Sequence, residues 1–190
     1  MPGTYTLDAF ALSGTTAITS RSSITVARRA FSEEKIELND TNSSIKGNLG
    51  PERLAQIESL NRLLARVDSS APRFAGPFKA PVAQTRHPAV YGDRRTYRYS
   101  SGKSELGIHF GTDYGIPTGT PVFAAGDGTV VMAESRISTG WTVVIEHLPG
   151  VYSLYYHLDA LTCSAGESVR TGTLIGRSGM TGLATGPHLH

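Results

Sequence analysis

The sequence predicts a mainly β protein: an antiparallel β-sheet domain over residues 73–190, a helical connector over 50–72 and a partial β region over 1–49. Two observations support this. The 21 glycines and ten prolines separate short runs rich in Val, Ile, Thr and Tyr, which is typical of strands joined by turns. Only one stretch of the chain has a convincing helical periodicity.

The first 49 residues carry weak strand signals. Short apolar and polar alternations near residues 5–10 and 23–27 predict two or three strands, split by a turn at Ser13-Gly14. So few strands do not close a sheet by themselves. With residues 29–38 they resemble the end of a β-sandwich domain whose beginning is missing. The polar run from Asn39 to Asn48 has no periodicity and predicts a loop.

The predicted helix covers residues 50–67. Pro51 suits the first helical position, and Glu58 and Arg62 are spaced to form an ion pair. An apolar stripe follows one broad face of the helix. It comprises Leu54, Ile57, Leu60 or Asn61, Leu64 and Val67. We expect a connector that packs this stripe on the next domain rather than a partner-binding helix.

Two hairpins are predicted in the C-terminal domain. Asp127-Gly128 between the apolar runs of 121–125 and 129–133 is a strong hairpin signal. A second hairpin joins residues 141–147 to 151–158. In its second strand His157 alternates with Tyr156 and Leu158, so we expect His157 to point inward and its two neighbours to face the other way.

Composition excludes several classes of function. The net charge is +2, no Lys/Arg block occurs, and the aromatic residues are not interleaved with basic ones, so we expect no nucleic-acid partner. Cys163 is the only cysteine, which excludes an intrachain disulfide and a CxxC site. No run reaches the length of a membrane span, and the start has no leader pattern, so we expect either an intracellular protein or one whose signal has been removed.

The glycine-rich stretch from Gly176 to the end contains a His-x-His pair, His188 and His190. In an extended strand residues two apart point to the same face, so both imidazoles are expected to face one pocket. One of them is suited to binding a metal while the other handles protons.

A second pair, His109 and Asp113, lies among Gly107, Gly111 and Gly115, which argue against a helix. Together with one histidine of the His-x-His pair, these residues make a set of two histidines and one carboxylate. Three protein ligands with an open position are what a hydrolytic zinc ion requires. The same set also serves non-haem iron, and a turn-capping Asp beside a surface His remains the simpler alternative.

Four segments carry a resemblance to a known family. They are Gly107-Ile-His-Phe-Gly-Thr-Asp-Tyr-Gly115, Gly119-Thr-Pro-Val-Phe-Ala-Ala-Gly-Asp-Gly-Thr-Val130, Tyr155-Tyr-His-Leu158 and Gly176 through Thr185-Gly-Pro-His-Leu-His190. In this order they resemble the lysostaphin/LytM-type zinc peptidoglycan endopeptidases, and the similarity covers roughly residues 77–190. The iron alternative fits less well, because those oxygenases typically begin with HxD or HxE and have no Thr-Gly-Pro-His.

The resemblance implies that His109, Asp113 and His190 bind Zn²⁺, and that His157 and His188 are catalytic. It further implies that zinc polarises the scissile carbonyl, that one of these two histidines deprotonates water and that the other stabilises the oxyanion or protonates the leaving amine.

The implied activity is hydrolysis of peptide cross-links in peptidoglycan, which places the protein outside the cytoplasm, in the periplasm or cell envelope. The implied partners are peptide stems or cross-bridges, with other envelope proteins as candidates. The alternative within the family is a LytM-like regulator that binds a cell-wall amidase without catalysis, although such proteins have usually lost some of the five residues.

Other charged and titratable residues have smaller expected roles. His147 and His87 match no motif position, so we expect packing or solvent exposure there. Arg94 or Arg95 is a candidate for lining the groove. The run 39–48 and the helix are candidates for covering the groove, or for placing an Asn or Asp side chain on the metal.

The end of the chain departs from the family pattern. The family continues its last strand past the second histidine of His-x-His, whereas this chain ends at His190. We therefore expect a truncated domain in which His190 lacks the backbone pairing and supporting contacts that orient a ligand.

Overall fold

The structure is a computed structural model that describes residues 1–13, 16–70, 74–83 and 86–190. Contacts divide the chain into two compact units, Met1–Ser32 and Glu33–His190. The second unit includes the predicted helical connector. Gly14 of the predicted turn and the predicted boundary at 72/73 both lie outside the described residues.

The first unit is a single hairpin. Strands β1 (Gly3–Ser13) and β2 (Thr16–Val26) pair antiparallel from Gly3 opposite Val26 to Ser13 opposite Thr16. All described side chains of β2 are exposed. An isolated two-stranded hairpin is marginal in water, so this unit has no core of its own.

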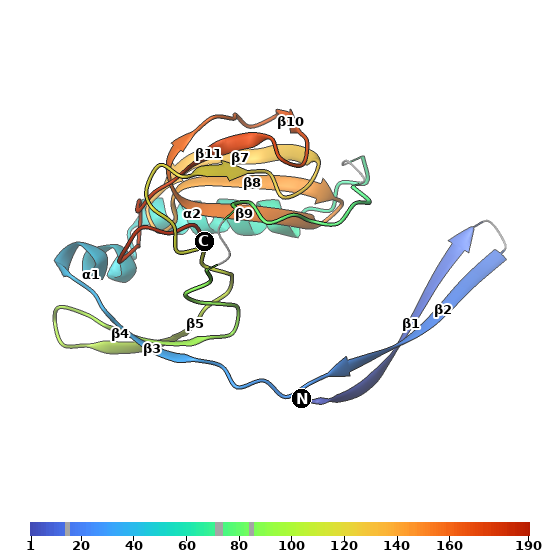
Figure 1. Ribbon diagram of the computed structural model, residues 1–190, viewed down its shortest axis with the longest axis horizontal. Coiled ribbons are helices and arrows are strands. Elements are labelled where there is room, and N and C mark those ends of the chain that lie inside the picture. The colour runs from blue at the N-terminus through green and yellow to red at the C-terminus, as the bar shows by residue number, and fades with distance from the viewer. Residues whose placement is uncertain (14–15, 71–73, 84–85) are drawn as a thin grey trace. The chain divides into compact units, whose positions relative to one another are not determined.

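The second unit contains a six-stranded antiparallel sheet in the order β10-β7-β8-β9-β11-β6, with a three-stranded sheet in the order β3-β4-β5 (Figure 1). The strands of the large sheet are β6 (Pro121–Phe123), β7 (Gly128–Arg136), β8 (Gly140–Leu148), β9 (Val151–Leu161), β10 (Ser168–Val169) and β11 (Leu174–Ser178). The predicted mainly β, antiparallel class is confirmed.

The core of the second unit lies on the large sheet. Strand β8 is its central apolar strand, and Val143, Val144 and Ile145 are all fully buried. A continuous apolar run of this kind indicates a strand covered on both faces. The buried Glu146 carboxylate of β8 lies 3.6 Å from the guanidinium of Arg66, which directly follows helix α2 (Pro51–Ala65).

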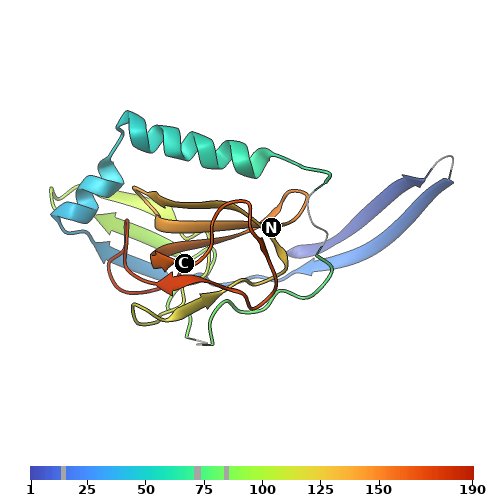
Figure 2. The ribbon, with the colours of Figure 1, turned by 90° about the horizontal axis from the view of Figure 1, so that it is seen from above.

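Helix α2 (Pro51–Ala65) confirms the predicted helix, with Gly50 as its N-cap and Pro51 at its start. It runs along the large sheet in both views (Figures 1 and 2). The predicted apolar stripe is covered only in part, since Leu60 and Leu64 are half-buried whereas Leu54 is 50% exposed and Val67, beyond the helix, is 71% exposed. Polar groups also attach the helix, because Gln56 accepts a hydrogen bond from the backbone N–H of Ile137 at 2.8 Å.

The predicted loop at 39–48 is also wrong, because it contains helix α1 (Asp40–Gly47). The Asn39 side chain caps the helix by accepting from the N–H of Asn42 at 2.8 Å. Asp40 and Lys46 complement the helix dipole at the two ends. The amide of Asn42 donates to the carbonyl of Ala184 at 3.0 Å, so tertiary packing supports a helix that has no periodic apolar pattern.

Of the two predicted hairpins, one is confirmed. Strands β8 and β9 are joined at Pro149-Gly150, where Gly150 has φ of 76°. The hairpin at Asp127-Gly128 is wrong, since β6 pairs with β11 and not with β7. The Asp127 carboxylate is used elsewhere, accepting from the backbone N–H of Thr171 at 2.7 Å.

The small sheet consists of β3 (Glu33–Glu37), β4 (Arg94–Arg98) and β5 (Ser104–Ile108). Strand β4 pairs antiparallel with β5 and parallel with β3. The single parallel pair departs from the predicted purely antiparallel arrangement. This pairing places β3, which precedes both helices in the sequence, beside β4, which precedes His109.

Candidate metal centre

His109 and Asp113 lie on the irregular segment that follows β5, as the surrounding glycines predicted. The N–H of His109 donates to the carbonyl of Asp93 at 2.9 Å, and the N–H of Asp113 donates to that of Ala89 at 2.9 Å. Gly111 lies between them, and a Cβ at this position would approach Nε2 of His190 to 2.5 Å. The chain therefore needs glycine here so that His190 can reach the same point.

His109, Asp113 and His190 converge. Nε2 of His109 lies 3.1 Å from Oδ1 of Asp113 and 2.9 Å from Nδ1 of His190, and that Nδ1 lies 2.9 Å from the same Oδ1. Three ligand atoms of the types that zinc prefers thus meet at one point. A cation satisfies three converging lone-pair atoms, so this donor set fits a metal.

Each of the three side chains has a supporting contact outside the cluster. Nδ1 of His109 donates to the carbonyl of Val90 at 3.1 Å, which leaves Nε2 for the cluster. The His190 ring stacks on Tyr156 with centroids 5.4 Å apart. Oδ2 of Asp113 accepts from the Arg95 guanidinium at 2.7 Å.

The backbone of His190 is ordered by pairing, contrary to our expectation for a terminal residue. Its carbonyl accepts from the N–H of Tyr156 at 2.9 Å, and Leu189 forms two hydrogen bonds with Tyr114. Leu189 points into the core while His188 and His190 face the pocket, as the His-x-His spacing predicted.

Asp113 is ionised under ordinary conditions. Burial by itself would raise the pKa of this carboxyl, but its close contacts with His109, His190 and Arg95 outweigh burial and hold its pKa far below the usual range. The cluster therefore presents a carboxylate rather than a carboxylic acid, which is the form that binds a cation.

His157 lies in strand β9 and is the one described residue other than glycine with positive φ, at 59°. The predicted alternation fails here, because two successive residues are both buried. Leu158 lies in the core, and His157 lies beside His188. The ring centroids of His157 and His188 are 4.7 Å apart. A left-handed backbone at a non-glycine residue is a strained feature that often marks a functional site.

Both of these imidazoles have a fixed tautomer. Nδ1 of His157 donates to the carbonyl of Thr181 at 2.7 Å, and Nδ1 of His188 donates to that of Gly186 at 2.8 Å. Burial, followed by the neighbouring charge of His188, lowers the pKa of His157 to about 4. His157 is therefore neutral near pH 7, with its lone pair on Nε2.

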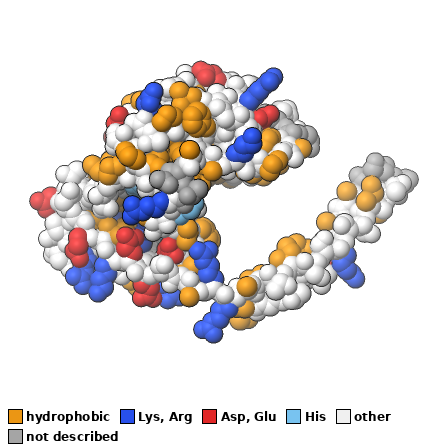
Figure 3. All heavy atoms as spheres, in the orientation of Figure 1, with side chains coloured by type: hydrophobic (Ala, Val, Ile, Leu, Met, Phe, Trp, Pro, Cys, Tyr) orange, Lys and Arg blue, Asp and Glu red, His pale blue; other side chains and the backbone are white. Residues whose placement is uncertain are grey.

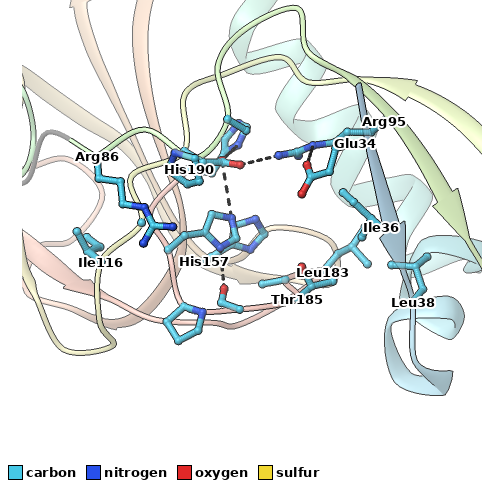
Figure 4. Close-up of a pocket in the computed structure, with 18 of the residues that line it drawn as sticks. Glu34, Ile36, Leu38, Arg86, Arg95, Ile116, His157, Leu183, Thr185 and His190 are labelled. Atoms are coloured by element: carbon cyan, nitrogen blue, oxygen red, sulfur yellow. Dashed lines mark hydrogen bonds and ion pairs between the residues drawn. The ribbon is translucent and has the colours of Figure 1, made fainter. Parts of the chain in front are cut away.

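Two pockets meet at the cluster. One, of about 530 Å³, includes Arg86, Ile116, Asp113, His157 and His188 in its lining, and Figure 4 shows Arg86 and His157 facing it. The other, of about 520 Å³, includes Phe110, Tyr114 and Tyr156. His190 lines both, so the cluster is reached from two sides. In Figure 3 histidine side chains are visible in a hollow of this face.

Several neighbouring residues were predicted in part or not at all. Arg95 was one of two candidates for the groove wall, and it contacts the cluster, whereas Glu34 carried no sequence signal. His147 is fully buried and bonded to the Asp127 carbonyl and the Ser153 hydroxyl, and His87 packs on Tyr114, in agreement with the packing roles expected of both.

The predicted covering role of 39–48 and α2 is not seen in the described contacts. The Asn42 side chain bonds to the backbone of Ala184. Among the described His, Cys, Asp and Glu residues, the one converging group is His109, Asp113 and His190. Strand β3 and the residue that follows it line the first pocket instead, through the side chains of Glu34, Ile36 and Leu38.

Two histidines and a carboxylate at one point, with two more imidazoles beside them, are the arrangement of a metal-dependent hydrolase centre. Comparison with known proteins agrees, since the profile of Peptidase family M23 matches residues 107–190. The resemblance that the motifs predicted is therefore confirmed for this segment.

The curated relatives are longer than this chain. ShyA, a peptidoglycan DD-endopeptidase of Vibrio cholerae, is 46% identical over 82 residues, which make up 43% of this chain and 19% of ShyA. Mpg, a DD-carboxypeptidase/endopeptidase of Neisseria meningitidis, is 40% identical over 110 residues, 58% of this chain and 24% of Mpg. ALE-1, a glycyl-glycine endopeptidase of Staphylococcus capitis, is 35% identical over 60% of this chain and 33% of ALE-1.

A solved structure supports the fold. A crystal structure described as a peptidase M23 of Pseudomonas aeruginosa has a TM-score of 0.67 and 22% identity, and the match covers 100% of this chain and 66% of that one. At this identity the likeness establishes the fold alone. Among the described residues, neither helix is long and apolar enough to cross a membrane.

Proposed function

We propose that this protein is a zinc-dependent endopeptidase that hydrolyses peptide cross-links of bacterial peptidoglycan. The observation that carries the proposal is the convergence of His109, Asp113 and His190 within 4.8 Å, beside two imidazoles with fixed tautomers. In this proposal the three converging side chains hold Zn²⁺, and His157 and His188 are catalytic. When bound, zinc acts as a Lewis acid on a carbonyl and lowers the pKa of water toward about 7.

The two catalytic imidazoles exchange protons at Nε2, because each Nδ1 is engaged by a backbone carbonyl. One imidazole accepts a proton from the attacking water. The other, once protonated, donates from Nε2 to the oxyanion or to the leaving amine. Each such role is typically worth about 10²–10⁴ in rate.

Access to the cluster from two pockets supports an endopeptidase. A peptide that runs from the pocket of Arg86 and Ile116 to the pocket of Phe110 and Tyr156 passes the cluster at His190. Such a path allows chain on both sides of the reacting bond. The first pocket offers a cation and an apolar wall, and the second offers aromatic faces.

The relatives support the substrate class. ShyA is a peptidoglycan DD-endopeptidase, and Mpg and ALE-1 are also peptide-cutting enzymes by their names. We infer that this chain acts on the peptide stems or cross-bridges of peptidoglycan. Because that substrate lies outside the cytoplasm, we place the protein in the periplasm or cell envelope, with envelope proteins as candidate partners.

The test is digestion of purified sacculi with and without a zinc chelator, followed by mass spectrometry of the released muropeptides. We expect chelator-sensitive loss of cross-linked species, with new amino termini and no new reducing sugar ends. The position of the new termini identifies the bond. A protein that binds one zinc ion but releases nothing would contradict the proposal and favour a regulator that lacks catalysis.

A further inference from the structure

We propose that Arg95 is a positioning residue for the metal centre and that strand β3 holds it in place through Glu34. This inference rests on the proposed function, because it takes Asp113 as a metal ligand. It assigns a role in the centre to a strand that lies outside the segment matched by the family profile, residues 107–190.

The two carboxylate oxygens of Asp113 have different partners. Oδ1 faces Nε2 of His109 and Nδ1 of His190, at 3.1 and 2.9 Å. Oδ2 accepts from a terminal nitrogen of Arg95 at 2.7 Å. Because Arg95 occupies Oδ2, Asp113 offers only Oδ1 to a cation. Arg95 thereby fixes the carboxylate as a one-oxygen ligand and holds its plane.

This contact is sheltered from solvent. The side chain of Arg95 is 14% exposed and that of Asp113 is 6% exposed. A charge-assisted hydrogen bond between largely buried groups is much less screened than a surface ion pair. Removing the guanidinium leaves a buried oxygen without its donor, so the carboxylate gains freedom to rotate away from the cluster.

Strand β3 supplies the second contact of Arg95. Glu34 lies opposite Arg95 in the parallel register of β3 and β4, and its Oε2 lies 3.5 Å from Nε of Arg95. That buried Nε has no hydrogen-bond partner among the described residues, so Glu34 contacts it as an ion pair. Figure 4 shows Glu34 beside Arg95 at the edge of the pocket. Glu34 thus places a negative charge beside the Arg95 guanidinium, on the side away from Asp113.

The next pair along the same register is a natural control. Glu33 lies opposite Arg94, and their charged groups are 3.6 Å apart, a distance like that of the Glu34–Arg95 pair. Their side chains are 77% and 69% exposed and do not contact the cluster. Since successive residues of a strand face opposite sides, the two pairs share a backbone and a charge but differ in access to the metal centre.

The experiment measures Zn²⁺ affinity by competition with a chromogenic chelator. Residues that support metal ligands typically change affinity by about 10- to 100-fold, and we expect that loss for Arg95→Gln. Glu34→Gln should weaken binding by a smaller factor. Arg94→Gln and Glu33→Gln should bind zinc as the wild type does.

A spectroscopic readout separates positioning from general stability. The visible spectrum of the Co²⁺-loaded protein reports the ligand arrangement, and we expect it to change in Arg95→Gln but not in Arg94→Gln. Thermal unfolding of the metal-free variants shows whether each is folded. If Arg95→Gln fails to fold, Glu34→Gln decides, because its side chain is 54% exposed and its loss leaves the strand pairing intact.

The outcomes are distinct. If wild type binds one zinc ion and both Arg95→Gln and Glu34→Gln bind it equally tightly with an unchanged Co²⁺ spectrum, Arg95 has no positioning role. If wild type binds no zinc, the ligand assignment of the proposed function fails, and this inference fails with it.

Discussion

Nδ1 of His157 donates a hydrogen bond of 2.7 Å to the backbone carbonyl of Thr181, which leaves the Nε2 lone pair of His157 for the pocket. The ring can take this position because the His157 backbone adopts φ of 59°. A strand residue with ordinary dihedral angles would continue the alternation with Tyr156 and Leu158. The strained backbone distinguishes this histidine from His109 and His190, which converge with Asp113.

The first prediction separates ligands from proton-transfer groups. His109→Ala and Asp113→Ala should lose zinc, because each removes one of three converging ligand atoms. His157→Ala and His188→Ala should keep zinc and lose about 10²–10⁴ in turnover. Metal content by mass spectrometry and cleavage of sacculi are the two measurements. An equal fall of metal content in all four variants would show that the division of roles is wrong.

The second prediction concerns the attachment of helix α2. Gln56→Ala removes the acceptor of the Ile137 N–H, a bond of 2.8 Å, and should lower the free energy of unfolding by about 0.5–1.5 kcal/mol. Arg62→Ala in the same helix is the control, because Arg62 is 73% exposed and its pair with Glu58 spans 3.8 Å. A surface pair of this kind contributes only about 0.3–0.5 kcal/mol.

Urea unfolding of both helix variants measures these changes. The two substitutions introduce the same residue into the same helix, so the gain in helix propensity is similar and nearly cancels in the comparison. If Arg62→Ala is as destabilising as Gln56→Ala, the helix is held by its surface charges and not by the contact with Ile137.

The convergence of His109 and Asp113 with the His-x-His pair was predictable because these sequence signals are local. His109 and Asp113 lie among glycines that exclude a helix, and His188 and His190 have the spacing that places both on one face. Glu34 was not predictable, since its role depends on a parallel pairing between segments 61 positions apart in sequence (from 34 to 95). No short-range pattern specifies such a pairing.

Local signals also failed where tertiary contacts dominate. Asp127-Gly128 has hairpin chemistry, but β6 pairs with β11 and the Asp127 carboxylate binds the loop at Thr171. A Cβ on Gly128 would collide with the carbonyl of Glu146, so this glycine serves close strand packing. The polar helix α1 was missed for the same reason, because Asn42 is bound by the distant carbonyl of Ala184.

The third prediction concerns the pH dependence of stability. Burial lowers the pKa of His147, whereas its pKa in the unfolded chain is about 6.5. The unfolded chain therefore binds the proton more readily, and the free energy of unfolding should fall as the pH falls from about 7 through 6.5. His147→Gln should show a shallower fall, because it lacks this titrating group.

Urea unfolding of the metal-free protein at neutral and mildly acidic pH measures the difference. Chelator is present so that metal binding does not contribute to the slope. The titration of His157 also lowers the free energy of unfolding at acidic pH, equally in both proteins, because burial lowers the pKa of His157 as well. Parallel slopes for wild type and His147→Gln would show that His147 takes up no proton on unfolding in this range.

The fourth prediction tests the support of the His157 tautomer. Gly140 has φ of 63°, and a Cβ at this position would overlap Thr181, whose carbonyl accepts from His157. Gly140→Ala should therefore be strongly destabilising and should also lower turnover, because Thr181 must move. The control is Gly102→Ala, where φ is 84° but a Cβ would meet nothing within 4 Å.

Gly102→Ala should lower the free energy of unfolding only by the strain of a left-handed backbone, about 1–2 kcal/mol, with unchanged turnover. Gly140→Ala should show the same strain together with the displacement of Thr181. Thermal unfolding and sacculus digestion at a temperature where both variants are folded measure the two effects separately. If Gly140→Ala is folded and cleaves sacculi as fast as Gly102→Ala, the carbonyl of Thr181 does not set the working position of His157.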